Sequence, residues 1–129
     1  NLKLDEGGIR EIEFFVQTLQ LLYGGRHPEI RSPNTLLCLE TLVRVGLVQT
    51  REAQQLKDAY LFLRKAEHRI QLTEEAQTHT LSSNSAEQKA VARKMGYFED
   101  NPEEAREHFL EDLSRYRTMV QNIFNSLFE

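Results

Sequence analysis

Apolar side chains dominate the first long segment of the chain, which runs from about residue 8 to residue 23. At the rotation of about 100° per residue of an α-helix, one face collects Ile9, Ile12, Val16, Leu19 and Tyr23. Four more apolar side chains widen that face, and the remaining polar stripe is narrow, consisting of Arg10, Glu13, Gln17 and Gln20. A helix that is apolar over most of its circumference is normally buried. We therefore predict that this helix is covered on several sides and is the central element of the fold.

Two helices are predicted to follow, each after a residue type that caps helices. Ser32 is the expected cap of the second helix, with Pro33 in its first turn and Gly46 at its end. The third helix is expected to begin at Thr50, because apolar residues then recur at spacings of three and four as far as Ile70. Its length would be about 20 residues, or roughly 30 Å.

The apolar pattern breaks over residues 73–84, where serine, threonine and asparagine predict a polar loop. Ser85 with Gln88 resembles a capping box, and the short helix after it should stop at Gly96. Asn101-Pro102 then predicts the start of a last helix. The apolar pattern of that helix continues for about 25 residues, or near 38 Å.

These elements define an all-α fold class, an antiparallel bundle of about five helices, three of them long. We assign residues 8–129 to the bundle, and only residues 2–4 have an alternation that suggests a strand. Because the first residue is Asn1 and not methionine, we expect the segment to come from a longer protein.

Composition and charge exclude several classes of protein. The apolar fraction of 40% and the charged fraction of 28% are ordinary for a globular domain. The net charge of −4 argues against a nucleic-acid partner, which requires a basic surface. No apolar run approaches the ~20 residues of a membrane span, so no membrane partner is expected. The single cysteine, Cys38, lies among leucines and predicts a buried thiol in a reducing compartment, hence a cytoplasmic protein.

The sequence lacks the usual signatures of a catalytic or metal centre. A zinc or di-iron site needs closely grouped ligands, but the four histidines are far apart: His27, His68, His79 and His108. The sequence also has no glycine-rich phosphate loop of the P-loop type. We therefore predict no catalytic residue, no metal site and no cofactor within this segment.

Charged residues of the first helix are the best candidates for a functional role. Glu11 projects toward the apolar arc, where a carboxylate requires a partner. Either the amides and dipole of the helix start satisfy it, or this face meets a second domain or a ligand. The polar stripe leaves the same choice between a solvated face and a network against a neighbouring domain. Arg26 and Arg31 are surface residues or, beside a missing domain, ligands for an anionic group.

A long motif opens the chain and continues through this helix. Its residues are Lys3-Leu4, Gly7-Gly8-Ile9-Arg10-Glu11-Ile12-Glu13-Phe14, Val16-Gln17, Leu19-Gln20-Leu21 and Gly24-Gly25-Arg26. The motif resembles the segment after the nucleotidyltransferase core of the bifunctional glutamine synthetase adenylyltransferase and adenylyl-removing enzymes, the glutamate-ammonia-ligase adenylyltransferases. The resemblance extends to about residue 81. Glu11, where the adenylylating half of such enzymes more often has aspartate, favours the N-terminal, deadenylylating half.

The resemblance implies a parent enzyme that adds and removes AMP on a tyrosine of glutamine synthetase and so regulates nitrogen assimilation. Such an enzyme uses ATP or phosphate with Mg²⁺, and it responds to glutamine and to the PII signal protein. Residues 1–7 would link this bundle to a preceding nucleotidyltransferase domain. The bundle would line one side of the catalytic cleft, and the residues expected to face the core are Lys3, Arg10, Glu11, Glu13 and Arg26. Two alternatives remain open: a docking module for glutamine synthetase or PII, and a structural spacer without a role in chemistry.

Overall fold

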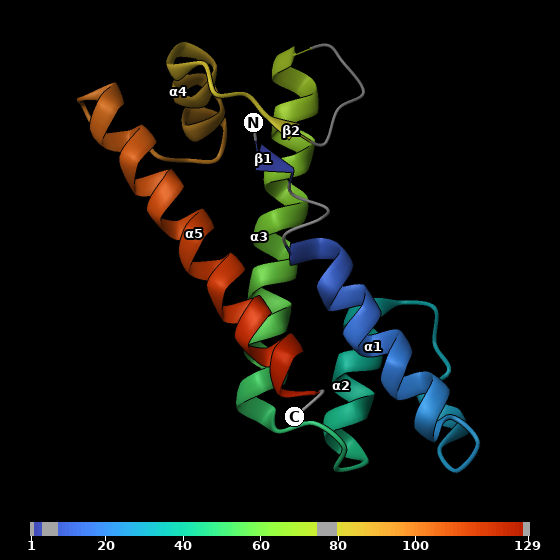
Figure 1. The fold of residues 1–129 in the computed structure, drawn as a ribbon. Helices are drawn as coiled ribbons and strands as arrows, with labels where there is room; N and C mark the ends of the chain where they lie inside the picture. Colours follow the sequence, from blue (N-terminus) through green and yellow to red (C-terminus); the bar gives the residue numbers. More distant parts are fainter. Residues whose placement is uncertain (1, 4–7, 75–79, 128–129) are drawn as a thin grey trace.

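The fold is a helical bundle, seen here in a computed structural model that describes residues 2–3, 8–74 and 80–127. Five α-helices form this part of the chain (Figure 1): α1 Arg10–Tyr23, α2 Thr35–Arg44, α3 Thr50–Glu74, α4 Ser85–Lys94 and α5 Pro102–Ser126. A short 3₁₀ helix, η2, covers Pro28–Ile30. Two short strands, β1 Leu2–Lys3 and β2 Thr80–Leu81, pair antiparallel, with Leu2 opposite Leu81. The predicted all-α class is confirmed.

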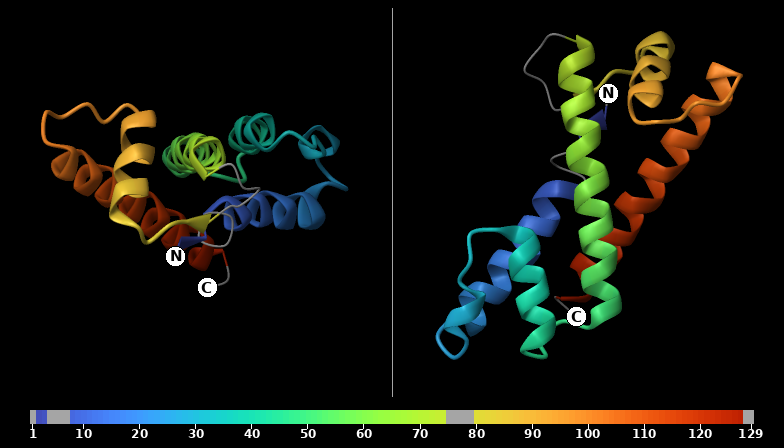
Figure 2. Two further views of the ribbon diagram at one scale, coloured as in Figure 1. Left: turned by 90° about the horizontal axis from the view of Figure 1, so that it is seen from above. Right: turned by 180° about the vertical axis from the view of Figure 1, so that it is seen from behind.

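Helix α3 is the central element, and α2, α4 and α5 lie against it. It runs the length of the molecule with α5 antiparallel beside it, α4 packed near its C-terminal end, and α2 beside its N-terminal end (Figures 1 and 2). Helix α1 packs against α2 and α5 at the margin of the bundle. None of the helices in the described part of the chain has both the length and the apolar character that a membrane span requires.

Small side chains explain why the rather polar α3 takes the central place. Its buried stripe contains three alanines, Ala53, Ala59 and Ala66, each of which is at most 7% exposed. Alanine lets neighbouring helices approach closely, while Leu56 and Leu63 between them fill the space that remains. A narrow apolar stripe can therefore serve as the packing surface for three other helices.

The prediction that the first helix is the centre of the bundle was wrong. Leu21 is 86% exposed, Leu22 is 62% exposed, and Phe14 is 53% exposed. In a bundle of this size the marginal helix has neighbours on only part of its circumference. The apolar arc of α1 is therefore wider than the surface that α2 and α5 cover.

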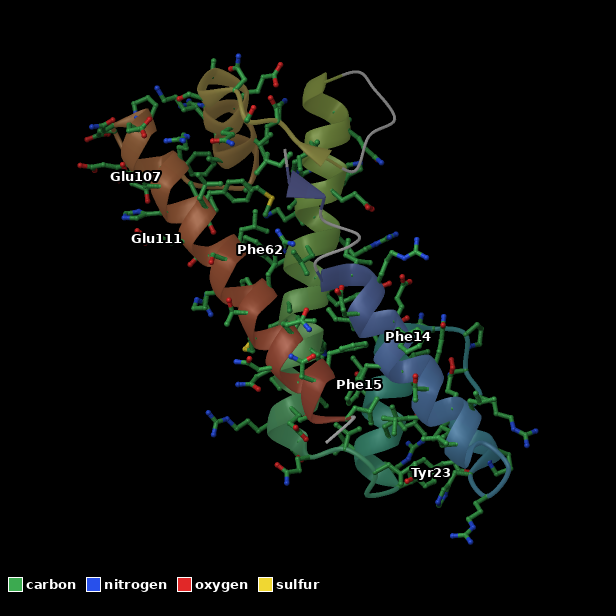
Figure 3. The ribbon with its side chains drawn as sticks, in the orientation of Figure 1. Phe14, Phe15, Tyr23, Phe62, Glu107 and Glu111 are labelled. Atoms are coloured by element: carbon green, nitrogen blue, oxygen red, sulfur yellow. The ribbon has the colours of Figure 1, made fainter. Side chains whose placement is uncertain are left out.

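Aromatic rings join α3, α5 and the connection between α4 and α5. Phe62 on α3 is labelled in Figure 3, and its ring centroid lies 4.7 Å from that of Tyr116 and 6.1 Å from that of Phe109. Tyr97 packs on the other side of Phe109, at 5.8 Å. Such offset aromatic contacts contribute about 0.5–1.5 kcal/mol each beyond the buried area. They stabilise the half of the bundle that lies away from α1.

Asparagine caps three of the helices, which corrects two of the predicted starts. The side chains of Asn34 and Asn84 accept hydrogen bonds from backbone amides in the first turns of α2 and α4, in place of the expected Ser32 and Ser85. Ser32 lies two residues before the observed cap of α2, and Ser85 one residue after that of α4. The predicted cap of α5, Asn101, is confirmed.

The ends of two helices and the loop after α3 can also be compared with the predictions. Gly46 and Gly96 have φ values of +81° and +100°, as expected for glycines that end helices. Helix α3 continues to Glu74, so the predicted loop is shorter than expected, and residues 75–79 lie outside the described part of the chain. The assignment of residues 1–7 as a linker stays a prediction, since residues 4–7 are also outside it.

Candidate functional site

Helix α1 has one face in the core and one face in solvent. Ile12, Phe15, Val16 and Leu19 are buried against the bundle. The opposite side carries four exposed residues at spacings of four, three and four, which place them in one row: Arg10, Phe14, Gln17 and Leu21. We call this row the outward face of α1. Phe14, labelled in Figure 3, is partly covered by the ring of Phe124, at a centroid distance of 5.9 Å.

Three charged side chains lie at the start of α1. The side chains of Arg10, Glu11 and Glu13 make no hydrogen bond or ion pair with any described residue. Arg10 and Glu13 are three residues apart. Elsewhere an arginine and an acidic residue at this spacing do form an ion pair, as Arg64 does with Glu67 at 3.4 Å. Two more such pairs lie on α5, Arg106 with Glu103 and Arg115 with Asp112. The Arg10–Glu13 pair at the start of α1 therefore differs from these three pairs in staying open.

Glu11 stands at the border between the outward face and the core. Its side chain is half-buried, and its Oε2 atom is buried without a hydrogen-bond partner. The first explanation offered by the sequence, satisfaction by backbone amides, therefore does not hold for this oxygen. Because Glu11 lies in the first helical turn, the helix dipole favours its negative charge.

Gln20 departs from the other polar residues of α1 and has a structural role. Its Nε2 atom donates to the carbonyl oxygens of Ile30 and Ser32, at 2.8 and 2.6 Å, and approaches the Sγ of Cys38 at 3.3 Å. Cys38 Sγ in turn donates to the Ile30 carbonyl at 3.2 Å. Burial raises the pKa of the Cys38 thiol, so it stays protonated and inert. The expected polar stripe is thus divided between an internal network and the outward face.

The structure does not bring all five predicted cleft residues together. Arg10, Glu11 and Glu13 lie within the first turn or so of α1, whereas Arg26 follows the other end of that helix, roughly 20 Å away at 1.5 Å per residue. Arg26 is exposed, and Arg31 donates from Nε to the Gly24 carbonyl at 2.8 Å. Lys3 lies on β1 opposite Thr80, and its side chain is outside the described part of the structure.

No group of three or more histidine, cysteine, aspartate or glutamate side chains gathers among the described residues in a way that could hold a metal ion. Sequence reasoning missed a groove of about 250 Å³ between α2 and α3. Its lining includes Leu39, Val43 and Ala53, and the ion pair of Lys57 with Glu40, at 3.9 Å, lies at this groove. The groove is smaller than the ~300–1,000 Å³ of typical ligand sites, and no sequence motif marks it.

Comparisons with known proteins agree with the motif of α1. The family described as GlnD PII-uridylyltransferase matches residues 1–128. Bifunctional glutamine synthetase adenylyltransferase/adenylyl-removing enzymes align with all 129 residues, at 44% identity in Rhodopseudomonas palustris (strain BisB5), 43% in Bartonella henselae and 39% in Alteromonas mediterranea. The chain spans 12–13% of the length of these curated relatives.

The resemblance inferred from the motif is therefore confirmed, although the comparisons do not specify which half of the relatives it matches. The similarity extends beyond residue 81, where the motif had given no more than a helical pattern, to the end of the chain. The chain belongs to the GlnD PII-uridylyltransferase family, and it is similar over its full length to a segment of the bifunctional glutamine synthetase adenylyltransferases.

Proposed function

We propose that this chain is a helical domain of an enzyme that adds AMP to glutamine synthetase and removes it again. Within that enzyme the bundle would line one side of the catalytic cleft of a neighbouring nucleotidyltransferase domain. The printed names of the relatives and their alignment with all 129 residues support the first part of this proposal. The Glu11 motif supports placing the chain in the deadenylylating half.

The outward face of α1 is the observation that carries the second part. Phe14 and Leu21 lie in solvent, and Arg10 beside them has no partner among the described residues. Apart from the contact of Phe14 with the Phe124 ring, the apolar surface of these two side chains stays in water. Covering a large apolar side chain gains about 1.5–3 kcal/mol, so a domain that packs on this face would stabilise the assembly. The face begins at the N-terminal end of α1, next to the residues that would lead in from a preceding domain.

The chemistry would reside outside this bundle. The parent would use ATP or phosphate with Mg²⁺, acting on glutamine synthetase in the cytoplasm under the control of PII and glutamine. Hard cations such as Mg²⁺ take oxygen ligands from converging carboxylates. Glu11 and Glu13 are two residues apart on a helix and so point to different sides, and they do not form such a site. The carboxylates for Mg²⁺ would belong to the nucleotidyltransferase domain.

The test compares two exposed arginines in the full-length parent. Arg10→Ala should lower the phosphorolysis of AMP from adenylylated glutamine synthetase about tenfold, equivalent to ~1.4 kcal/mol of lost transition-state stabilisation. Arg93 on α4 is likewise exposed and without a partner among the described residues, so Arg93→Ala is the matched control and should retain full activity. Equal activity of both variants would reject a role for α1 at the cleft.

A second measurement separates the alternatives. If the chain alone captures glutamine synthetase or PII from purified components, and Arg10→Ala leaves phosphorolysis unchanged, the bundle is a docking module. If neither binding nor activity responds to substitutions at Arg10, Glu13 and Gln17, the bundle is a spacer that orients other domains.

A further inference from the structure

A surface without charged side chains joins the second half of α1 to the end of α5. All charged residues of α1 lie within its first four positions, and residues 14–23 contain none. Residues 118–126 of α5 contain none either. The two segments meet where the ring of Phe14 packs on that of Phe124, at a centroid distance of 5.9 Å. We call the exposed side chains of these two segments the neutral surface.

The part of the neutral surface that lies on α1 is apolar. Leu21, Leu22 and Tyr23 are consecutive and exposed, and Phe14 lies in the same row as Leu21, two turns earlier. The other large exposed apolar side chains of the described chain are separated from one another in sequence: Leu37, Leu61, Leu72 and Phe98. Single apolar side chains are ordinary on a protein surface, whereas a contiguous group of them marks an interaction site.

The composition of the neutral surface indicates what kind of partner covers it. The core of an interface is depleted in charge, and permanent interfaces are more apolar than transient ones. A second domain of the same polypeptide is a permanent partner, and its linkage gives it a high effective concentration. The chain spans 12–13% of the length of its curated relatives, so a parent of that length has further domains that can cover this surface.

The charged end of α1 has the opposite character. Arg10 is exposed and lies roughly 16 Å from Leu21 along the helix, at 1.5 Å per residue. A guanidinium that stays in water can bind the phosphate groups of a nucleotide. We infer that a neighbouring domain of the same polypeptide is seated permanently on the neutral surface, and that the Arg10 end of α1 stays open to the cleft. This inference rests on the proposed function.

The first arm of the test uses the chain alone. Leu21→Gln and Leu22→Gln replace mostly exposed side chains, and glutamine forms helices nearly as well as leucine. Both variants should therefore keep the melting temperature within about 2 °C. Leu72→Gln on α3 replaces a leucine that is 56% exposed, so it is the matched control and should behave in the same way. A clearly larger drop in Leu21→Gln or Leu22→Gln than in this control would overturn the inference, because these leucines would then stabilise the bundle itself.

The second arm uses the full-length parent and follows amide hydrogen exchange in residues 17–23. Exchange should be at least tenfold slower in the parent than in the chain alone, and a double variant with Leu21→Gln and Leu22→Gln should lose most of this protection. Leu72→Gln should keep the protection. Arg10→Ala should also keep it while phosphorolysis falls, because the Arg10 end lies outside the contact.

The outcomes separate this inference from the proposed function. If residues 17–23 exchange equally fast in the parent and in the chain alone, or if the double variant retains the protection, the inference is overturned. Protection that falls when the parent is diluted, or that requires added glutamine synthetase or PII, would also overturn it, because the covering partner would then be a separate molecule. If Arg10→Ala leaves phosphorolysis unchanged, the proposed function fails, whatever the exchange measurement gives.

Discussion

Gly8 packs against Leu63 so closely that a β-carbon on the glycine would stand 2.4 Å from the Cδ1 atom of the leucine. Gly8 belongs to the motif at the start of the chain, and Leu63 lies in the middle of α3 with no exposed surface. The glycine therefore sets how closely the start of α1 approaches the central helix. The part of the motif that carries Arg10 and Glu11 is fixed to the bundle at this contact.

Replacing Gly8 by alanine should destabilise the fold. The added methyl group needs space that the buried Leu63 occupies, and overpacking of this kind costs about 1–3 kcal/mol. The measurement is the urea midpoint of the chain, followed by circular dichroism of the helices.

Gly25 provides the matched control for that substitution. No atom would lie within 4 Å of a β-carbon at Gly25, and its φ is outside the left-handed region. Gly25→Ala should leave stability unchanged or raise it by about 0.4–1 kcal/mol through the unfolded state. If the two alanine variants unfold at the same urea concentration, the close contact with Leu63 does not limit the packing of α1.

Replacing Gln20 by alanine should loosen the segment between α1 and α2. The substitution removes both donors to the Ile30 and Ser32 carbonyls, and Ser32 then loses its partner, at a cost of about 1–2 kcal/mol. Gln17→Ala, on the outward face, should change stability by no more than about 0.5 kcal/mol. Equal effects of the two substitutions on the free energy of unfolding would contradict a structural role for Gln20.

The helices were predictable from the sequence because their signals are local. Periodic apolar residues, Asn101-Pro102 and the two glycines with positive φ mark helices and their ends within a few residues. The arrangement of the helices was not predictable in this way, because the high apolar content of the first helix wrongly indicated a central position for it. The central position of α3 depends on alanines such as Ala59. Their contribution can be recognised only when the neighbouring helices that pack on them are known.

The candidate site was predictable in part for the same reason. Motif and periodicity singled out Arg10, Glu11 and Glu13, which do lie together at the start of α1. Motif and periodicity could not show that Gln20 has a structural role and is not part of the outward face. Its hydrogen-bond partners are carbonyl groups ten and twelve residues further along the chain. Arg26 was grouped with the others by its place in the motif, although a whole helix lies between them.

Tyr97 should ionise only at high pH, and its hydroxyl should stabilise the connection between α4 and α5. The hydroxyl donates to Asp112 Oδ2 at 2.5 Å. Burial and, secondly, this hydrogen bond raise the pKa of the Tyr97 phenol. The neutral phenol therefore favours the folded state, and its contribution is complete below the unfolded pKa of about 10 and lost as pH rises through the folded value. Absorbance titration should show that Tyr97→Phe removes the tyrosine signal that appears last.

The same substitution tests the hydrogen bond at neutral pH. Tyr97→Phe keeps the ring against Phe109 and removes the donor, so the free energy of unfolding should fall by about 1 kcal/mol. Asp112 retains its ion pair with Arg115, at 3.4 Å, which limits the loss. An unchanged titration curve in Tyr97→Phe would show that another tyrosine is the last to ionise.

The pair of His108 with Glu99 should make the stability of this same connection depend on pH. The Nδ1 atom of His108 lies 2.6 Å from Glu99 Oε1. This hydrogen bond lowers the pKa of Glu99 and raises that of His108, and the charges of Glu111 and Glu104 raise the latter further. The Glu99 contribution is present above its unfolded pKa of about 4.3 and is lost as pH falls through the lowered value. The His108 contribution is present below about 6.5 and is lost as pH rises through the raised value.

Both contributions are complete between about pH 4.3 and 6.5. The difference in urea midpoint between the unmodified chain and His108→Gln should therefore be largest in that interval and decline on either side. His68→Gln serves as the control, because His68 Nδ1 lies 3.2 Å from Arg69 Nη1 and pairs with no carboxylate among the described residues. A double-mutant cycle with Glu99→Gln should give a coupling that follows the same pH profile. A coupling that stays constant from pH 4 to pH 9 would show that packing, and not the ion pair, holds His108 and Glu99 together.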